Sequence, residues 1–356
     1  MKNTESEVKE YLTQLLTVFP TYNLNGDDKK VVQRDVATFI LQKLTRKKFR
    51  KQKLHPDTIQ EFTTKIATKV KEDKPIHFTI PFGGYKHYWN PSHPDPDWAE
   101  IFTLRFLIEW VSPIITTYKP GVVIDFISED LILPRMNNYP EDVLEKYSQA
   151  FSSLLDTYRQ FLPKNLKINY FRVGDRYDKK AIIKEVEDLL PERWEKWNTY
   201  TSEEKEIELK RSKRAIMWNG NHDLANLSDE EKEKRMIESR LIELAYYDIE
   251  AKPNFLGDYY TEDNRIGICF SFGLSPDNVT HWITLGSTYA SSVDYWIGRG
   301  ILEKTQEGFI PRIISKEQYQ KVKNSLQTTQ IKFTELPAKN YQSIEIISSI
   351  DWHSIL

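Results

Sequence analysis

Residues 76–80 read Ile-His-Phe-Thr-Ile and residues 122–127 read Val-Val-Ile-Asp-Phe-Ile, and these two apolar runs decide the fold. A third run of the same kind covers residues 166–173. Short apolar runs of this length, separated by segments with helical periodicity, are typical of strands joined by crossover helices. Because such crossovers join parallel strands, the sequence predicts a parallel sheet built from these three runs.

A long apolar helix is predicted between the first two strands. Asp97 can cap it, Glu100 occupies the capping-box position, and the apolar residues that follow recur on most faces. We expect Pro113 to kink this helix and Pro120-Gly121 to end it. A helix that is apolar on most of its faces should be buried against a sheet.

The segments before the first strand have weaker signals. Residues 1–28 are expected to form a loosely attached N-terminal arm that contains a short amphipathic helix. A helix is predicted over about 29–49, with a basic stretch at its end in residues 46–53. Residues 29–356 are then predicted to form a single α/β domain.

The second half of the chain changes character twice. Residues of about 179–252 interleave opposite charges with helical periodicity, which predicts an insertion of exposed helices. Strand-like runs return at 266–272, 281–285 and 343–347. The predicted fold is therefore α/β, with a Rossmann-like, mostly parallel sheet flanked by helices, a charged helical insertion and a β-rich C-terminal part.

Composition excludes several classes of protein. The 50 basic and 52 acidic side chains give a formal net charge of -2, so no global field attracts nucleic acid or an anionic membrane. A single cysteine, Cys269, rules out an intrachain disulfide and is expected in the core. With neither a signal-peptide pattern at the N-terminus nor an 18-residue apolar run, we expect a cytoplasmic protein without a membrane partner. The oligomeric state stays open.

Charged and aromatic side chains follow each predicted strand. In an open parallel sheet, ligands bind outside the carboxyl ends of the strands, so these side chains should meet in one crevice. Lysine and arginine suit phosphate or carboxylate, while the acidic residues could bind an amine or act as a base. The candidate substrate-binding residues are Lys86, Tyr85, His87, Trp89, Ser128, Arg135, Arg172, Arg176 and Tyr177, and the candidate catalytic residues from these loops are Glu129, Asp130 and Asp175.

Other kinds of site have less support. His87, His93, Asp95 and Asp97 do not match a metal-binding spacing, so no metal is predicted. Neither a glycine-rich dinucleotide motif nor a phosphate loop is present, and no cofactor is predicted. In the C-terminal half, His281 is the best candidate for proton transfer because histidine titrates near neutrality.

The order of these motifs resembles the isonitrile synthase family, which includes the pyoverdine and dityrosine biosynthesis proteins. In that family a strand enters a Phe-Pro-x-Lys-Ser-Pro-Asn loop, Pro-Asp-x-x-Glu opens an apolar helix, Tyr-x-Pro-Gly precedes a strand that ends in Ser-Asp-Gly, and an Asp-Leu-Tyr follows later. The similarity covers residues 36–180, and the Lys-Ser-Pro-Asn core is replaced here by Lys86-His87-Tyr88-Trp89. The matching stretches are Ile80 to Lys86, Pro96 to Glu100, Tyr118 to Gly121, Ser128 to Asp130 and Asp175 to Tyr177.

The resemblance implies an enzyme that works without a metal. The amine of an amino acid, or of a similar small amine, would condense with the ketone of ribulose 5-phosphate and leave as an isonitrile. Lys86, Arg172 and Arg176 would hold the sugar phosphate. Asp130 or Glu129 would bind the amine or act as base, and His281 would serve as acid.

A nucleic-acid-associated protein is the alternative from another class. It would use the basic residues at 46–53 and 210–214 together with exposed aromatic side chains. Such binding is sensitive to salt, since it releases counterions from the nucleic acid. The near-neutral net charge makes nucleic acid the less favoured partner.

Overall fold

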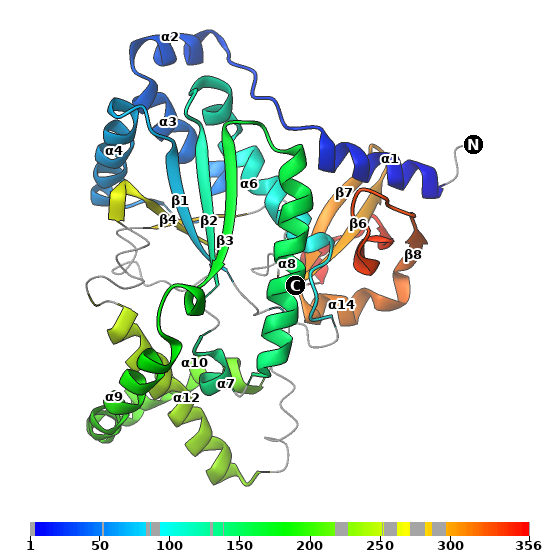
Figure 1. Ribbon diagram of the computed structural model, residues 1–356. Coiled ribbons are helices and arrows are strands. Elements are labelled where there is room, and N and C mark those ends of the chain that lie inside the picture. The colour runs from blue at the N-terminus through cyan, green and yellow to red at the C-terminus, as the bar shows by residue number, and fades with distance from the viewer. Residues whose placement is uncertain are drawn as a thin grey trace.

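The computed structural model describes residues 4–51, 53–82, 86, 93–128, 131–137, 139–217, 227–250, 252, 262–270, 282–286 and 297–355. They form a five-stranded sheet with the order β3-β2-β1-β4-β5 and a four-stranded sheet with the order β7-β6-β9-β8. Figure 1 shows the second sheet beside the first, and a group of helices beyond one end of the first sheet. The predicted fold class, including the charged helices and the β-rich C-terminal part, is confirmed.

The five-stranded sheet is entirely parallel and supplies the main core. Strands β1 (Ile76–Phe82), β2 (Val122–Ser128) and β3 (Leu166–Arg172) lie side by side over their full lengths. On the other side of β1, the sheet continues with β4 (Ile266–Cys269) and β5 (Trp282–Thr284). Six of the seven residues of β2 are buried, as expected for a strand with other strands on both sides.

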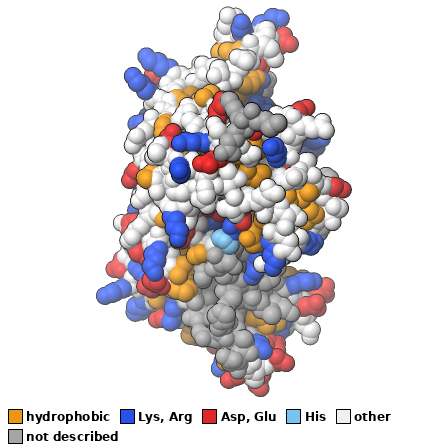
Figure 2. All heavy atoms as spheres, turned by 90° about the vertical axis from the view of Figure 1, so that its right-hand side faces the viewer, with side chains coloured by type: hydrophobic (Ala, Val, Ile, Leu, Met, Phe, Trp, Pro, Cys, Tyr) orange, Lys and Arg blue, Asp and Glu red, His pale blue; other side chains and the backbone are white. Residues whose placement is uncertain are grey.

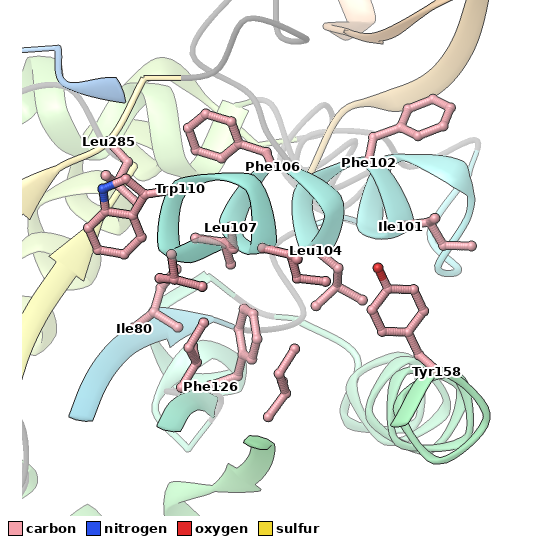
Figure 3. Close-up of a cluster of buried hydrophobic side chains, with 14 of the residues drawn as sticks. Ile80, Ile101, Phe102, Leu104, Phe106, Leu107, Trp110, Phe126, Tyr158 and Leu285 are labelled. Atoms are coloured by element: carbon pink, nitrogen blue, oxygen red, sulfur yellow. The ribbon is translucent and has the colours of Figure 1, made fainter. Parts of the chain in front are cut away.

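Helix α6 (Trp98–Thr117) connects β1 to β2 and lies between the two sheets. Fifteen of its 20 residues are buried, so it has almost no solvent-facing side. Figure 3 shows Ile80 and Phe126 of the parallel sheet on one side of the helix and the rings of Phe102 and Phe106 on the other. The helix also contacts β6 and β7 of the second sheet. Pro113 lies inside it, and the predicted capping box between Asp97 and Glu100 is formed.

The turn into β2 depends on a glycine. Gly121 has a φ of +73°, in the left-handed region that side chains disfavour. A Cβ at this position would lie 1.8 Å from the carbonyl oxygen of Asn165. The predicted stop at Pro120-Gly121 therefore coincides with a position that accepts only glycine.

The N-terminal segments differ from the expectations drawn from the sequence. Helix α1 (Thr4–Thr17) is not a loose arm, because Val8, Leu12 and Leu16 are buried in the main core. The single helix predicted over 29–49 is two helices, α2 (Gly26–Arg34) and α3 (Val36–Leu44). Asp35 separates them: its backbone is extended, and its side chain accepts a hydrogen bond from the Ala37 N–H at the start of α3.

Two helices complete the layers around the parallel sheet. Helix α4 (Pro56–Lys71), which the sequence analysis did not predict, packs beside α3 and β1. Helix α8 (Glu141–Tyr158) agrees with the predicted helix before β3 and covers the face that carries Phe82 and Phe126. Short helix α7 (Leu133–Asn137) precedes it.

The charged segment forms α9 (Lys179–Thr199), α10 (Ser202–Met217) and α12 (Asp229–Glu250). Apolar residues of α9 and α12 form a smaller core cluster with Ile127 and Val173. Arg240 of α12 is buried and pairs with Glu208 of α10, at 2.5 Å, and with Glu243. The pair of Arg240 and Glu208 therefore joins α12 to α10.

The second sheet forms the β-rich C-terminal part. Strands β6 (Arg299–Thr305) and β7 (Gly308–Ile314) form an antiparallel hairpin, and β9 (Ser343–Ser348) pairs in parallel with β6 and antiparallel with β8 (Gln327–Gln330). Helix α14 (Lys316–Val322) packs beside them. Only β9 was predicted as a strand. Among the described residues, no helix has the length and apolar character needed to cross a bilayer.

Candidate active site

The carboxyl ends of three strands lie at one level. Phe82 of β1 pairs with Ser128 of β2, and Ser128 pairs with Arg172 of β3. The predicted convergence of these strand ends is therefore present in the fold. The sheet also changes winding direction between β1 and β4, and ligands of open α/β sheets bind outside the strands at such a switch point.

About half of the predicted site residues belong to the described part of the chain. These are Lys86, Ser128, Arg135, Arg172, Asp175, Arg176 and Tyr177. The other predicted residues, which lie outside the described residues, are Tyr85, His87, Trp89, Glu129, Asp130 and His281.

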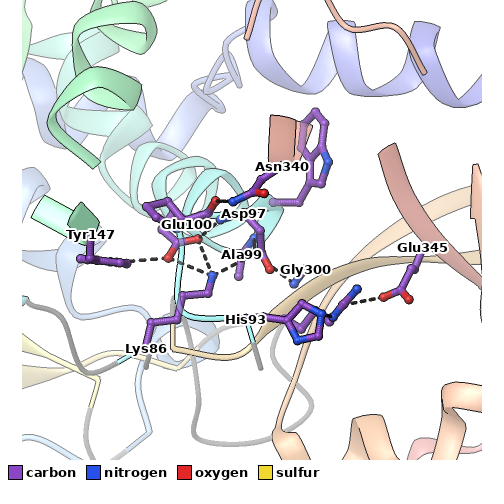
Figure 4. A network of polar contacts seen from close by, with 12 residues as sticks. Lys86, His93, Asp97, Ala99, Glu100, Tyr147, Gly300, Asn340 and Glu345 are labelled. Atoms are coloured by element: carbon purple, nitrogen blue, oxygen red, sulfur yellow. Dashed lines mark hydrogen bonds and ion pairs between the residues drawn. The ribbon is translucent and has the colours of Figure 1, made fainter. Parts of the chain in front are cut away.

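Lys86 is the centre of a buried polar cluster just beyond the end of β1 (Figure 4). Its Nζ lies 2.9 and 2.7 Å from the two carboxylate oxygens of Glu100 and 3.0 Å from Oδ1 of Asp97. Tyr147 of α8 donates a hydrogen bond of 3.1 Å to Oε1 of Glu100. The side chains of Lys86 and Glu100 are both 0% exposed.

These contacts decide what Lys86 can do. An ammonium group has three N–H donors, and three carboxylate oxygens of Glu100 and Asp97 surround this one. The sequence suggested that Lys86 would bind a sugar phosphate, but here it is an internal ion-pair partner. With one cation between two acidic side chains, the cluster suits an amine or a proton better than a second anion.

Glu100 is the group in this cluster that titrates near neutrality. Its complete burial raises its pKa to about 7, because removal from water penalises the charged form, while Lys86 opposes the rise. Burial also raises the pKa of Tyr147 well above its ordinary value, so the phenol keeps its proton and remains a donor to Glu100. A carboxyl group with a pKa near 7 can both accept and donate a proton at physiological pH.

Asp97 connects the cluster to the second sheet. Its Oδ1 accepts hydrogen bonds from the Ala99 N–H at 2.7 Å and from the Gly300 N–H of β6 at 3.3 Å. The carboxylate that caps α6 therefore also joins the helix to β6. Asp97 and Glu100 therefore form the capping box and also contact Lys86, and the sequence pattern alone does not reveal this second contact.

His93 and Arg299 continue the polar network toward β9 (Figure 4). Arg299 lies 2.5 Å from Glu345, contacts Nε2 of His93 and stacks over the ring of Tyr319. Burial and then the nearby Arg299 lower the pKa of His93 to about 4. His93 is therefore neutral at physiological pH and accepts a hydrogen bond from Arg299.

Ser128 ends β2 with a buried hydroxyl group. The residue is 0% exposed, and its Oγ makes no hydrogen bond within the described structure. Buried hydroxyl groups are usually hydrogen-bonded, and each exception needs an explanation. A bound ligand would satisfy this one, and the substrate-binding role of Ser128 stays a prediction.

The remaining predicted residues lie toward α8 and the charged helices. Arg172 pairs with Glu145 of α8, and Arg135 pairs with Glu187 of α9. Arg176 stacks on the ring of Phe171 at 3.7 Å, and Tyr177 packs against the smaller core cluster. Asp175 is exposed and is not part of the Lys86 cluster.

Sequence reasoning missed the main components of this cluster. Asp97 was considered only as a helix-capping residue and as a metal ligand without a matching spacing, Glu100 only as a capping residue, and Tyr147 was not considered. The one available signal was the capping glutamate in the first turn of a helix that is apolar on most faces, since such a helix is expected to bury its first turn. Among the described residues, no group of three or more His, Cys, Asp or Glu side chains could hold a metal ion.

The basic stretch at 46–53 makes internal contacts. Arg46 donates to the carbonyl oxygens of Lys43 and Trp110, and Lys51 donates to that of Phe270 at 2.5 Å. Figure 2 shows acidic and basic side chains interspersed on the face it displays. The side chains of 211–214 lie outside the described ones. Several cations of the proposed nucleic-acid patch are thus engaged within the fold.

Comparison with known proteins gives a structural likeness. No protein-family model matches the sequence, and no curated protein matches it. The crystal structure of the PvcA protein from Pseudomonas aeruginosa is similar, with a TM-score of 0.55 over 96% of this chain and 99% of that chain. The two sequences are 14% identical, so the likeness shows a common fold.

Proposed function

We propose that the protein is an enzyme resembling the isonitrile synthases, and that it acts on an amino acid or similar small amine together with a phosphorylated sugar. The observation that carries the proposal is the buried cluster of Lys86, Asp97, Glu100 and Tyr147 at the switch point of the sheet. Support comes from the order of sequence motifs, which resembles that of the isonitrile synthase family, and from the fold shared with PvcA.

Glu100 would move the protons of the condensation. When a primary amine condenses with a ketone to form an imine, nitrogen loses two protons in turn and the carbonyl oxygen gains two, so that it departs as water. A carboxyl group with a pKa near 7 can take each proton from nitrogen and supply one to oxygen. Lys86 would hold Glu100 and Asp97 in place as a charged partner and would not itself form a bond to the ketone.

Tyr147 and Ser128 would support this step. The Tyr147 hydroxyl donates a hydrogen bond to Oε1 of Glu100. The protonation of that carboxyl group therefore depends on Tyr147 as well as on Lys86. The Ser128 hydroxyl, which has no hydrogen-bond partner among the described residues, would bind a substrate oxygen at the end of β2. Asp130, Glu129 and His281 remain candidates for binding the amine and for a further proton transfer.

The test is a reaction assay with purified protein. Amino acids and small amines would be incubated with ribulose 5-phosphate, and mass spectrometry would follow loss of the sugar phosphate and formation of a nitrogen-containing product. We expect wild-type protein to form product and Glu100→Gln to lose at least 100-fold in rate, in line with the usual contribution of a general acid or base.

Lys184→Ala is the control, because Lys184 forms an exposed ion pair with Asp188 on α9. It should keep the wild-type rate. If folded wild-type protein consumed no sugar phosphate with any of the amines, or if Glu100→Gln reacted at the wild-type rate, the proposal would be refuted.

A further inference from the structure

The β-rich C-terminal part of the chain packs directly against the start of α6. Asn340 donates a hydrogen bond of 3.0 Å to the carbonyl oxygen of Pro96, and the indole N–H of Trp98 donates one of 3.0 Å to the carbonyl oxygen of Ser343. Figure 4 shows Asn340 beside the polar cluster at the start of this helix. Because Asn340 and Ser343 lie on either side of Tyr341 in the sequence, these two bonds hold Tyr341 close to the first turn of α6.

Tyr341 is buried against that turn. The residue is 3% exposed, and its ring lies edge to face with the ring of Trp98, with the two centroids 5.5 Å apart. Its hydroxyl group has no hydrogen-bond partner among the described residues. Most buried hydroxyl groups are hydrogen-bonded, so this exception needs a physical explanation.

Three carboxylates act on the Tyr341 hydroxyl group. Burial raises the pKa of Tyr341 well above its ordinary value. The charges of Glu100, Asp97 and Asp95, in that order of size, raise it further. The phenol therefore keeps its proton at physiological pH and can donate a hydrogen bond.

Glu100 has no lone pair left to accept that hydrogen bond. Its Oε1 accepts from Lys86 and Tyr147, and its Oε2 accepts from Lys86 and from the Asp97 N–H. A carboxylate offers about four lone-pair positions, and these four contacts occupy them. The hydroxyl group of Tyr341 is therefore a donor next to the cluster that the cluster itself does not use.

We propose that Tyr341 is a substrate-contacting residue of the active site, and that its hydroxyl group donates a hydrogen bond to the carbonyl oxygen of the substrate as the amine attacks. A carbon–nitrogen bond forms and the carbonyl electrons move to oxygen. Glu100 gives this oxygen a proton and takes one from nitrogen, while Tyr341 keeps its own proton and stabilises the developing negative charge. Donors placed in advance at such an oxygen contribute strongly to catalysis.

This role makes the second sheet part of the active site. Tyr341 lies just before β9, far along the chain from Lys86, Glu100 and Tyr147. The inference rests on the proposed function, because the charged oxygen forms only during the reaction. The lack of an internal partner for the hydroxyl group is a property of the ligand-free protein, however, so stability and reaction rate are measured separately.

Tyr341→Phe removes only the hydroxyl group and keeps the buried ring. Tyr118→Phe is the matched control, because Tyr118 is also buried and ends α6 at its other end. The Tyr118 hydroxyl donates to the carbonyl oxygens of Lys69 and Lys74, at 3.2 and 2.8 Å. Loss of a hydroxyl that has internal partners leaves buried acceptors unsatisfied and destabilises the fold, whereas loss of an unpaired hydroxyl does not.

Thermal unfolding of the ligand-free proteins and product formation from amines and ribulose 5-phosphate should therefore give opposite results for the two variants. We expect Tyr341→Phe to keep or raise the melting temperature and to lose at least tenfold in kcat, with a smaller change in KM, because the charge develops only in the transition state. Tyr118→Phe should lower the melting temperature and keep the wild-type kcat.

Two results would overturn the role of Tyr341 and leave the proposed function in place. One is a wild-type kcat in Tyr341→Phe, and the other is a fall in its melting temperature as large as that of Tyr118→Phe, which would show an internal partner for the hydroxyl group. If folded wild-type protein forms no product with any amine, the proposed function itself fails, and the role of Tyr341 in the reaction fails with it.

Discussion

Replacement of Lys86 by methionine would remove the charge at the centre of the candidate active site while keeping a long apolar side chain. The ammonium is fully buried and lies within 3.0 Å of three carboxylate oxygens of Glu100 and Asp97. Loss of one partner of a buried ion pair costs about 3–5 kcal/mol, because the remaining charge is left uncompensated. We expect a loss of this size in the free energy of unfolding of Lys86→Met.

The loss should depend on pH in a definite direction. Burial raises the pKa of Glu100 from 4.5 to about 7, so the folded state holds this proton more tightly than the unfolded state. The stability that Glu100 contributes is therefore complete below about pH 4.5 and is lost as pH rises through about 7, a difference of about 3 kcal/mol. Without Lys86 the pKa of Glu100 rises further, so Lys86→Met should lose more stability at about pH 8 than at about pH 5.

Urea unfolding at the two pH values measures both effects, provided that the m-value is unchanged. Lys184→Met is the control, since Lys184 and Asp188 are 74% and 62% exposed and ion pairs this exposed contribute little to stability. The double variant Lys86→Met/Glu100→Gln should recover part of the loss by removing the unpaired charge. A loss below about 1 kcal/mol at both pH values, or one that does not grow with pH, would refute this reasoning.

Three further outcomes are expected. Tyr147→Phe removes a hydrogen bond to the Glu100 carboxylate, so it should raise the pKa of Glu100. Urea unfolding above pH 7 should then show a loss of stability of about 1 kcal/mol, and unchanged stability would contradict the contact. Gly121→Ala should lower the free energy of unfolding by more than about 2 kcal/mol, because Gly121 has a positive φ and a carbonyl oxygen lies close to it. Gly26→Ala is the control and should have almost no effect. Equal melting temperatures of the two variants would exclude the predicted clash. Gel-shift assays with single-stranded RNA and DNA at about 50 mM salt should show no binding through residues 46–53, and a shift that disappears at about 200 mM salt would support the nucleic-acid alternative.

The sequence predicted the central architecture because its signals are local. Apolar runs, a capping box and Pro120-Gly121 define β1, α6 and β2 within one stretch of the chain. The break at Asp35 was missed because its neighbours continue the helical periodicity, and only its extended backbone separates α2 from α3. The hairpin of β6 and β7 was missed for a different reason, since Pro311 and alternating charges weaken its strand pattern.

The sequence predicted which segments carry the site, but it did not predict the contacts between their side chains. The convergence of strand ends follows from parallel pairing, which makes Ser128 and Arg172 neighbours. That Lys86 pairs with the capping residue Glu100 depends on how the loop returns to α6, and Tyr147 comes from a helix beyond β2. No sequence pattern marks either contact. The sequence therefore could not show that Lys86, which was expected to bind phosphate, pairs with two carboxylates inside the protein.

The most direct test of the site is a crystal structure of the protein soaked with L-phenylalanine and ribulose 5-phosphate. We expect ligand density at the carboxyl edge of the parallel sheet, with the amine or ketone within hydrogen-bonding distance of Glu100 or Ser128. Density for both ligands away from this edge, with Glu100 enclosed as before, would contradict it.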